Sequence, residues 1–117
     1  MRKVFHLSTC STCQRIIAQL DSKLKDFQLQ DIKTEGISQK ELEYMAKLAG
    51  SFEALFSRRA MKFRAMGLNE KELSEKDYKE LILSEYTFLK RPVIVDEGEI
   101  FIGNAKKTVE AAQAHLE

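Results

Sequence analysis

The sequence predicts an α/β protein built on one mixed four-stranded sheet with helices on its faces. The chain opens with a strand–helix–strand pattern, carries helical periodicity through its middle, and closes with two short strands and a helix. A strand–helix–strand crossover makes its two strands parallel, whereas a tight turn makes its strands antiparallel. The two ends of the chain together therefore predict a mixed sheet.

The opening pattern consists of two strands around a helix. Residues 4–7 form a short apolar run, and residues 27–32 alternate apolar and polar side chains, as in a strand buried on one side. Between them, residues 13–24 are expected to be helical, with Ile16, Ile17 and Leu20 on one face. These two strands are expected to lie parallel.

Helical segments fill residues 38–88, which we expect to form an insert between the second and third strands. Ser38, followed three residues later by Glu41, is typical of a capping box, and Gly50 ends that helix. Residues 52–56 predict a short helix or turn, and another helix opens at residues 74–77. With this insert, the whole chain from 1 to 117 is expected to form one domain.

The C-terminal segment has the pattern of a hairpin followed by a helix. Residues 92–95 and 100–102 are the two predicted strands, and the turn between them contains Gly98. Gly103 and Asn104 predict a second turn before a final helix over residues 105–116.

Length, composition and net charge indicate an ordinary globular protein and give no sign of a membrane protein or a nucleic-acid-binding protein. The chain has 117 residues, of which 44% are hydrophobic and 32% charged, enough for one core in an ordinary globular protein. A net charge of +1 gives no reason to expect direct nucleic-acid binding or an acidic membrane as partner. No apolar run resembles a signal peptide or a membrane span, so we expect a cytoplasmic protein.

Cys10 and Cys13 are the only cysteines, and they lie where the first strand gives way to the first helix. The unpaired N–H groups and the positive dipole of a helix N-terminus favour an anion, so Cys10 is predicted to have a lowered pKa and to be the nucleophile. Cys13, one turn later, can resolve a mixed disulfide. Ser11 and Thr12 between them are small and polar, leave the thiols accessible, and can donate hydrogen bonds to sulfur.

Zinc is the alternative use of such a pair. Tetrahedral zinc needs four ligands, and only His6 and His115 are available besides the cysteines, with His115 at the far end of the last helix. The sequence therefore predicts a redox pair and no metal site.

With this element order, the Cys-x-x-Cys motif and the single proline Pro92 at the third strand, the chain resembles the thioredoxin-like fold. Residues 89–95, Leu-Lys-Arg-Pro-Val-Ile-Val, followed by Gly103 and Asn104, resemble the signature of the arsenate reductase-like (ArsC/Spx) family, which includes the Spx-type transcription regulators. The resemblance covers essentially the whole chain, and the helical insert is the family's usual elaboration.

The resemblance implies roles for individual residues. Cys10 matches the family's reactive cysteine, and Arg91 matches the arginine that holds an anion or thiolate near it. Pro92 matches a cis-proline beside the active site, and His6 takes the place of a histidine of some arsenate reductases. From its place in a short strand, His6 is first interpreted as a partly buried histidine with satisfied hydrogen bonds, and tuning of the Cys10 pKa is the alternative. Arg59 aligns with an arginine that Spx-like members carry in the insert, so it joins Ser11, Thr12 and Pro92 as a candidate binding residue.

The chain departs from the glutaredoxin-coupled arsenate reductases, which typically have one cysteine in this loop and three arginines around the oxyanion. Here Cys13 adds a second thiol, and Gly103 stands where the third arginine is expected. Ser57 is the position closest to their insert arginine. These departures favour the Spx-like side of the family.

Two functions from different classes follow. The first is a thiol–disulfide oxidoreductase that uses Cys10 and Cys13 to reduce arsenate or disulfides and needs no bound cofactor. Its expected partner is a small thiol or a redox protein. Its electrons would come from glutathione and glutaredoxin or from thioredoxin. The alternative is an Spx-type redox-sensitive regulator that binds the RNA polymerase α subunit through Arg58, Arg59 and Arg64. A basic run of this kind is usually a solvated helix face.

Overall fold

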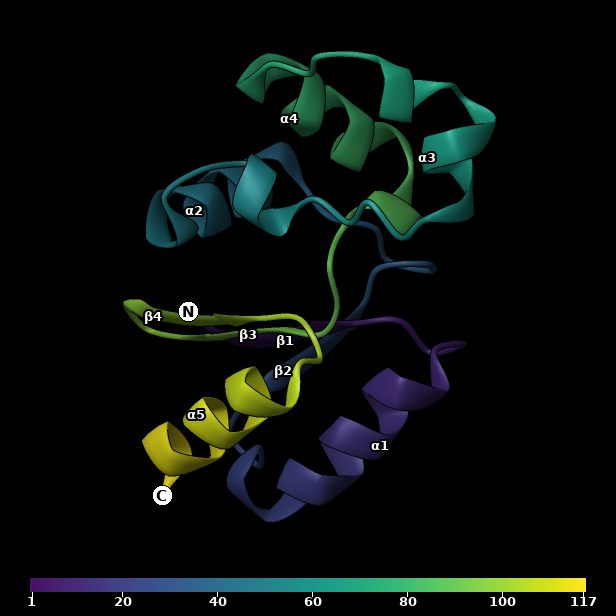
Figure 1. The fold of residues 1–117 in the computed structure, drawn as a ribbon. Helices are drawn as coiled ribbons and strands as arrows, with labels where there is room; N and C mark the ends of the chain where they lie inside the picture. The colour runs from purple at the N-terminus through teal and green to yellow at the C-terminus, as the bar shows by residue number, and fades with distance from the viewer. The chain divides into compact units, whose positions relative to one another are not determined.

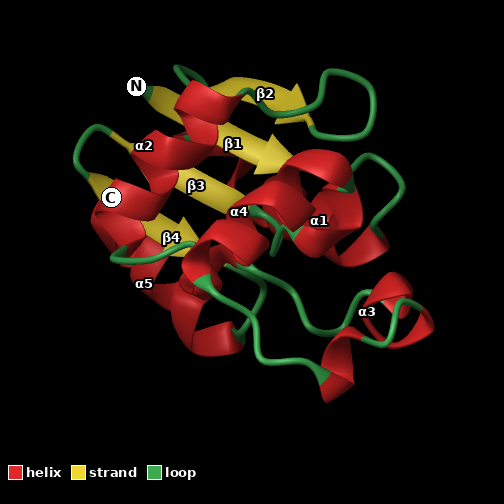
Figure 2. Ribbon diagram, turned by 90° about the horizontal axis from the view of Figure 1, so that it is seen from above, coloured by secondary structure: helices red, strands yellow, loops and turns green.

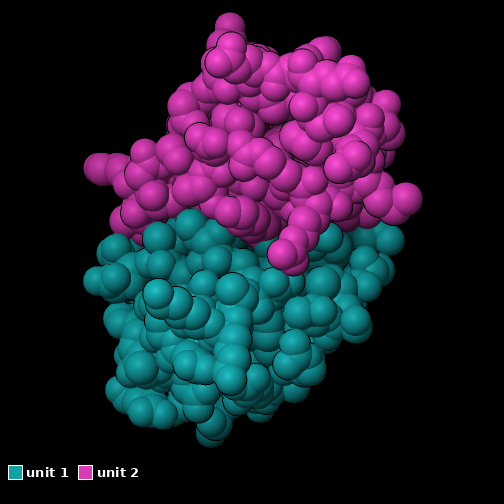
Figure 3. All heavy atoms as spheres, viewed as in Figure 1, with its two compact units in different colours: residues 1–36, 91–117 teal, residues 37–90 magenta.

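A computed structural model describes residues 1–117. The chain divides into two compact units, one made of residues 1–36 and 91–117 and the other of residues 37–90 (Figure 3). The second unit thus contains the segment predicted as a helical insert. None of the helices combines the length and the apolar character that crossing a membrane would require.

The first unit contains a four-stranded sheet in the order β2-β1-β3-β4 (Figures 1 and 2). Its strands are β1 (Arg2–His6), β2 (Gln28–Asp31), β3 (Val93–Asp96) and β4 (Glu99–Ile102). Strand β1 pairs parallel with β2 and antiparallel with β3, which pairs antiparallel with β4. This confirms the predicted mixed sheet, with β1 and β3 at its centre.

Helices α1 (Ser11–Leu20) and α5 (Lys106–Leu116) cover one face of this sheet (Figure 1). Their apolar sides meet β1 and β3 in a single buried cluster, which comprises Val4, Ile16, Leu20, Leu24, Phe27, Ile94, Val109 and Ala112. Helix α1 starts two residues earlier than predicted because Cys10 acts as its N-cap. It also ends earlier, at Leu20, and the chain continues as a short 3-10 turn, Asp21–Lys23.

The alternation predicted for the second strand is only partly correct. Phe27 and Ile32 are buried, but Leu29 is 44% exposed whereas Gln30 is 6% exposed. Strand β2 lies at the sheet edge, where Leu29 has a neighbouring strand on one side only. The Gln30 amide can be buried because it accepts from Lys3 Nζ (3.1 Å) and donates to the Gly36 carbonyl (2.9 Å).

The second unit is helical, with α2 (Gln39–Ala49), α3 (Met61–Ala65) and α4 (Glu75–Ser84) joined by short 3-10 turns. The predicted capping box at Ser38 and Glu41 is present, and Gly50 ends α2 with a φ of 98°, a left-handed conformation that favours glycine. Phe56 lies at the centre of its core. It packs against three other aromatic rings, those of Phe63, Tyr78 and Phe88.

Candidate active site at the first helix N-terminus

Cys10 lies at the N-terminus of α1, as its sequence position predicted. A tight turn brings the chain from β1 into the helix, closed by a hydrogen bond from the Cys10 N–H to the Leu7 carbonyl (3.0 Å). The Cys10 sulfur then accepts the backbone N–H of Cys13 at 3.5 Å, taking the place that an oxygen occupies in most N-caps. The sulfur therefore accepts a hydrogen bond from one of the helix N–H groups that have no partner within the helix itself.

The surroundings of Cys10 favour its thiolate. Partial burial opposes ionisation, but the Cys13 backbone N–H, the Cys13 thiol and the Arg91 guanidinium all donate to the sulfur. Together with the positive charge of Arg91, these hydrogen bonds hold the pKa of Cys10 below its ordinary value. Cys10 is also partly accessible, as a nucleophile must be.

Cys13 has the opposite character. Its side chain is fully buried, and this burial, with the hydrogen bond and charge of Cys10, raises its pKa to about 12. The Leu7 backbone N–H and the charge of Arg91 act in the other direction without overcoming the burial. The two cysteines are 3.7 Å apart and unbonded. One thiol is therefore prepared to ionise while its neighbour stays protonated.

Arg91, two residues before β3, interacts with the Cys10 sulfur, and Pro92 follows it in the chain. The Arg91–Pro92 peptide bond is cis, which confirms the conformation that the family resemblance implied. The Pro92 carbonyl accepts the N–H of Gly103 at 2.9 Å, and Gly103 has a φ of 92°. An arginine at position 103 would be strained in that backbone conformation, which explains why glycine suits this position.

His6 ends β1 and is half-buried. Its Nδ1 is 3.2 Å from the side-chain nitrogen of Gln14, and the same nitrogen donates to the Leu7 carbonyl at 2.9 Å. Sequence reasoning missed Gln14. Its place directly after Cys13, in the first turns of the helix, was the one sequence feature that could have indicated a role beside the cysteines.

Asp31 was also missed. Its carboxylate, at the end of β2, accepts the Ser8 N–H (3.3 Å) and the Lys33 N–H (3.1 Å). Hydrogen bonding from the Ser8 side chain is the main reason that the pKa of Asp31 is lowered. The turn that carries Cys10 is thus held by α1 on one side and by β2 on the other.

Three remaining candidates contribute less to this geometry. Ser11 is exposed and Thr12 is half-buried, and no hydrogen bond joins either hydroxyl to a sulfur. Arg59 belongs to the second unit, where it is exposed and has no hydrogen bond or ion pair. No group of three or more histidine, cysteine or acidic residues is arranged to hold a metal ion.

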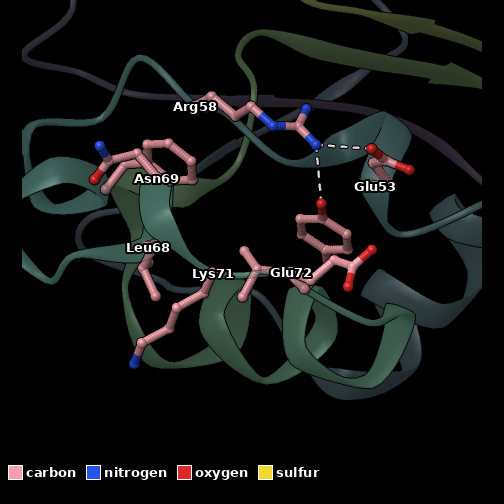
Figure 4. Close-up of a pocket in the computed structure, with 9 residues that line it drawn as sticks. Glu53, Arg58, Leu68, Asn69, Lys71 and Glu72 are labelled. Carbon is pink, nitrogen blue, oxygen red and sulfur yellow. Dashed lines mark hydrogen bonds and ion pairs between the residues drawn. The ribbon is translucent and has the colours of Figure 1, made fainter.

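Arg58 occupies a different setting, a hollow of about 460 Å³ within the second unit (Figure 4). Its Nη2 donates to Glu53 Oε2 at 2.7 Å and to the Tyr78 hydroxyl at 2.9 Å. These bonds connect the turn at Glu53 to helix α4. Arg58 therefore has a structural role inside its own unit.

A mixed sheet with a Cys-x-x-Cys at the first helix N-terminus and a cis-proline before the third strand defines a protein of the thioredoxin-like fold. The sequence model of the ArsC family matches residues 5–112. The chain therefore belongs to the ArsC family.

Relatives and solved structures agree with this assignment. The global transcriptional regulator Spx of Streptococcus pyogenes serotype M1 is 30% identical over 104 residues, which cover 88% of this chain and 78% of the regulator. A possible arsenate reductase from Streptococcus mutans is 28% identical, with a TM-score of 0.77 and coverage of 96% and 97%. The YffB protein shares the fold at 23% identity, with a TM-score of 0.84 over the full length of both chains.

Proposed function

We propose that this protein is a thiol–disulfide oxidoreductase that uses Cys10 and Cys13 as a redox pair to reduce a disulfide or arsenate. The observation that carries the proposal is the contrast between the two thiols, which are 3.7 Å apart. Cys10 is accessible with a lowered pKa, whereas Cys13 is buried with a pKa of about 12. A nucleophilic thiol must be accessible and readily ionised, as Cys10 is, whereas a resolving thiol must stay protonated until the mixed disulfide has formed, as Cys13 does.

With a disulfide substrate, the reaction has two steps. The Cys10 thiolate attacks one sulfur, a Cys10–substrate disulfide forms, and the other half of the substrate leaves as a thiolate. Cys13 then gives up its proton and attacks the Cys10 sulfur, which releases the second half as a thiolate. The substrate gains two electrons, and the enzyme, which has lost them, is left with a Cys10–Cys13 disulfide. A cellular dithiol or two monothiols restore the reduced pair.

The first step also prepares the second. Two of the causes that raise the pKa of Cys13 are the hydrogen bond and the charge of Cys10. Once Cys10 is in a neutral mixed disulfide, its negative charge is gone, while the Leu7 N–H and Arg91 still favour a Cys13 thiolate. The pKa of Cys13 therefore falls when its attack is required.

Turnover by the purified protein tests the proposal. Reduced protein is mixed with arsenate, glutathione and glutaredoxin, or with a model disulfide and thioredoxin, and NADPH consumption is followed through the coupled reductases. We expect turnover with one of the two substrates. Cys10→Ser should abolish it, and Cys13→Ser should accumulate the mixed disulfide. Full activity in Cys10→Ser would refute the mechanism.

A second candidate is a redox-sensitive regulator that binds the α subunit of RNA polymerase. Relatives named as Spx regulators favour it, and so does the surface of α3. There Met61 is 90% exposed, with exposed Arg59 and Arg64 nearby in sequence and unpaired. The test is whether the wild-type chain captures the purified C-terminal domain of the RNA polymerase α subunit. Capture that is lost on Arg59→Ala with Arg64→Ala, together with absent turnover, would favour this function over the enzyme.

A further inference from the structure

Gln14 connects three parts of the cysteine site. It follows Cys13 in α1, and its side-chain nitrogen lies 2.9 Å from the Leu7 carbonyl and 3.2 Å from His6 Nδ1. Leu7 is the last residue before the turn that carries Cys10, and its carbonyl also accepts the Cys10 N–H. A single amide thus spans the gap between the end of β1 and the first turns of α1.

The direction of these bonds is fixed by chemistry. A carbonyl oxygen can only accept, so the Gln14 nitrogen, not its oxygen, must face Leu7. The amide has two hydrogens on that nitrogen, and the second one points to His6 Nδ1. His6 Nδ1 must therefore be an acceptor, which places the imidazole proton on Nε2. If Nδ1 carried a proton, Gln14 could not satisfy both partners.

Leu7 in turn reaches the resolving thiol. Its backbone N–H donates to the Cys13 sulfur, and its carbonyl accepts from Cys10 and Gln14. The position of this one residue matters at each stage, because it orients the turn under Cys10 and stabilises negative charge on Cys13. Whatever holds Leu7 in place acts on both thiols.

We propose that Gln14 is a positioning residue for the resolving step: its amide holds Leu7 against α1 so that the Leu7 N–H faces the Cys13 sulfur, and it selects the Nε2–H tautomer of His6. The inference rests on the proposed function, since a resolving step requires the Cys10–Cys13 pair. Gln14 touches neither substrate nor the reacting sulfurs in this role.

A chromogenic aromatic disulfide, 5,5′-dithiobis(2-nitrobenzoate), separates the two steps. Cys10 attacks it, forms a mixed disulfide and releases one thionitrobenzoate. Cys13 then loses its proton to solvent, attacks the Cys10 sulfur and releases the second. Gln14→Met keeps the length of the side chain but removes both donors. Gln19→Met, on the exposed side of the same helix, is the matched control.

We expect the second release to slow about tenfold in Gln14→Met, the effect of losing one hydrogen bond to an oriented group, with the first release nearly unchanged. Gln19→Met should behave as wild type. Equal second-phase rates in Gln14→Met and wild type would overturn the inference. A wild-type protein that releases only one equivalent, like Cys13→Ser, would instead refute the proposed function.

The His6 tautomer gives an independent readout that a merely structural role would not move. Nitrogen-15 NMR of the reduced protein should show a protonated Nε2 and an unprotonated Nδ1. Gln14→Met should weaken that preference, while Gln19→Met leaves it intact. A protonated Nδ1 in neutral His6 of the wild type would contradict the bond directions and overturn the proposal, even if Gln14→Met were too poorly folded for kinetics.

Discussion

Alkylation of the reduced protein should label Cys10 and almost spare Cys13. Iodoacetamide reacts with thiolates, so each rate follows the thiolate fraction. Raising the pKa of Cys13 from 9.0 to about 12 lowers its thiolate fraction near pH 8 by about 1000-fold relative to an ordinary thiol. Complete burial of Cys13 slows the reagent further. Cys10, with a lowered pKa and partial exposure, should react faster than an ordinary thiol.

The assay is a time course of modification near pH 8, read by mass spectrometry of the peptide that contains both cysteines. Protein unfolded in urea provides the control, because both thiols should then react at similar rates. Cys10→Ser removes the hydrogen bond and the charge that Cys10 contributes to the raised pKa of Cys13. In that variant Cys13 should react faster than in wild-type molecules whose Cys10 is still unmodified, yet more slowly than in the unfolded chain, because burial remains.

Comparable labelling of Cys10 and Cys13 in the folded wild-type protein would refute the reasoning. It would mean that burial and the neighbouring thiolate do not suppress ionisation of Cys13. If Cys13 were instead labelled no faster in Cys10→Ser than in wild-type molecules with unmodified Cys10, burial alone would account for its protection. The coupling between the two thiols would then play no part in the mechanism.

Three further results are expected. Arg91→Ala should raise the Cys10 pKa because it removes a hydrogen bond and a positive charge, and the thiolate absorbance should then appear at higher pH. Arg91→Lys should raise the pKa less. An unchanged titration in Arg91→Ala would exclude Arg91 from tuning Cys10. In urea denaturation, Leu20→Ala should lower the free energy of unfolding by about 3 kcal/mol. Leu29→Ala, at a 44% exposed position, should lower it by less than about 0.5 kcal/mol. Equal losses in the two variants would contradict the burial of Leu20 and the exposure of Leu29. Ser38→Ala should cost about 1 kcal/mol by losing the capping box of α2, and Ser38→Asp should retain most of it.

The parts of the site that sequence reasoning found are those defined by local spacing. Cys10 precedes a helix by one residue and Cys13 follows one turn later, so the chain itself places one thiol at the helix N-terminus. Arg91 and the cis-proline followed from the resemblance to a family, since they lie far away in sequence.

Gln14 and Asp31 could not be found in the same way. Each acts on backbone groups of the turn at Leu7 and Ser8, and backbone groups leave no signature in a sequence. The fold shows the same limit at Leu29 and Gln30. Alternation predicted which side chains share a face, but the edge position of β2 and the partners of the Gln30 amide decided which were buried.

The unit that carries the cysteines is assembled from two separate stretches of the chain, whereas residues 37–90 form a unit from one continuous stretch. During synthesis, Cys10 leaves the ribosome early, but strand β3 and Arg91 follow only after the whole of the second unit. The central pairing of β1 with β3 must wait until then. Until then Cys10 lacks the hydrogen bond and the positive charge of Arg91, so its full set of thiolate-stabilising partners assembles only after the second unit has been made.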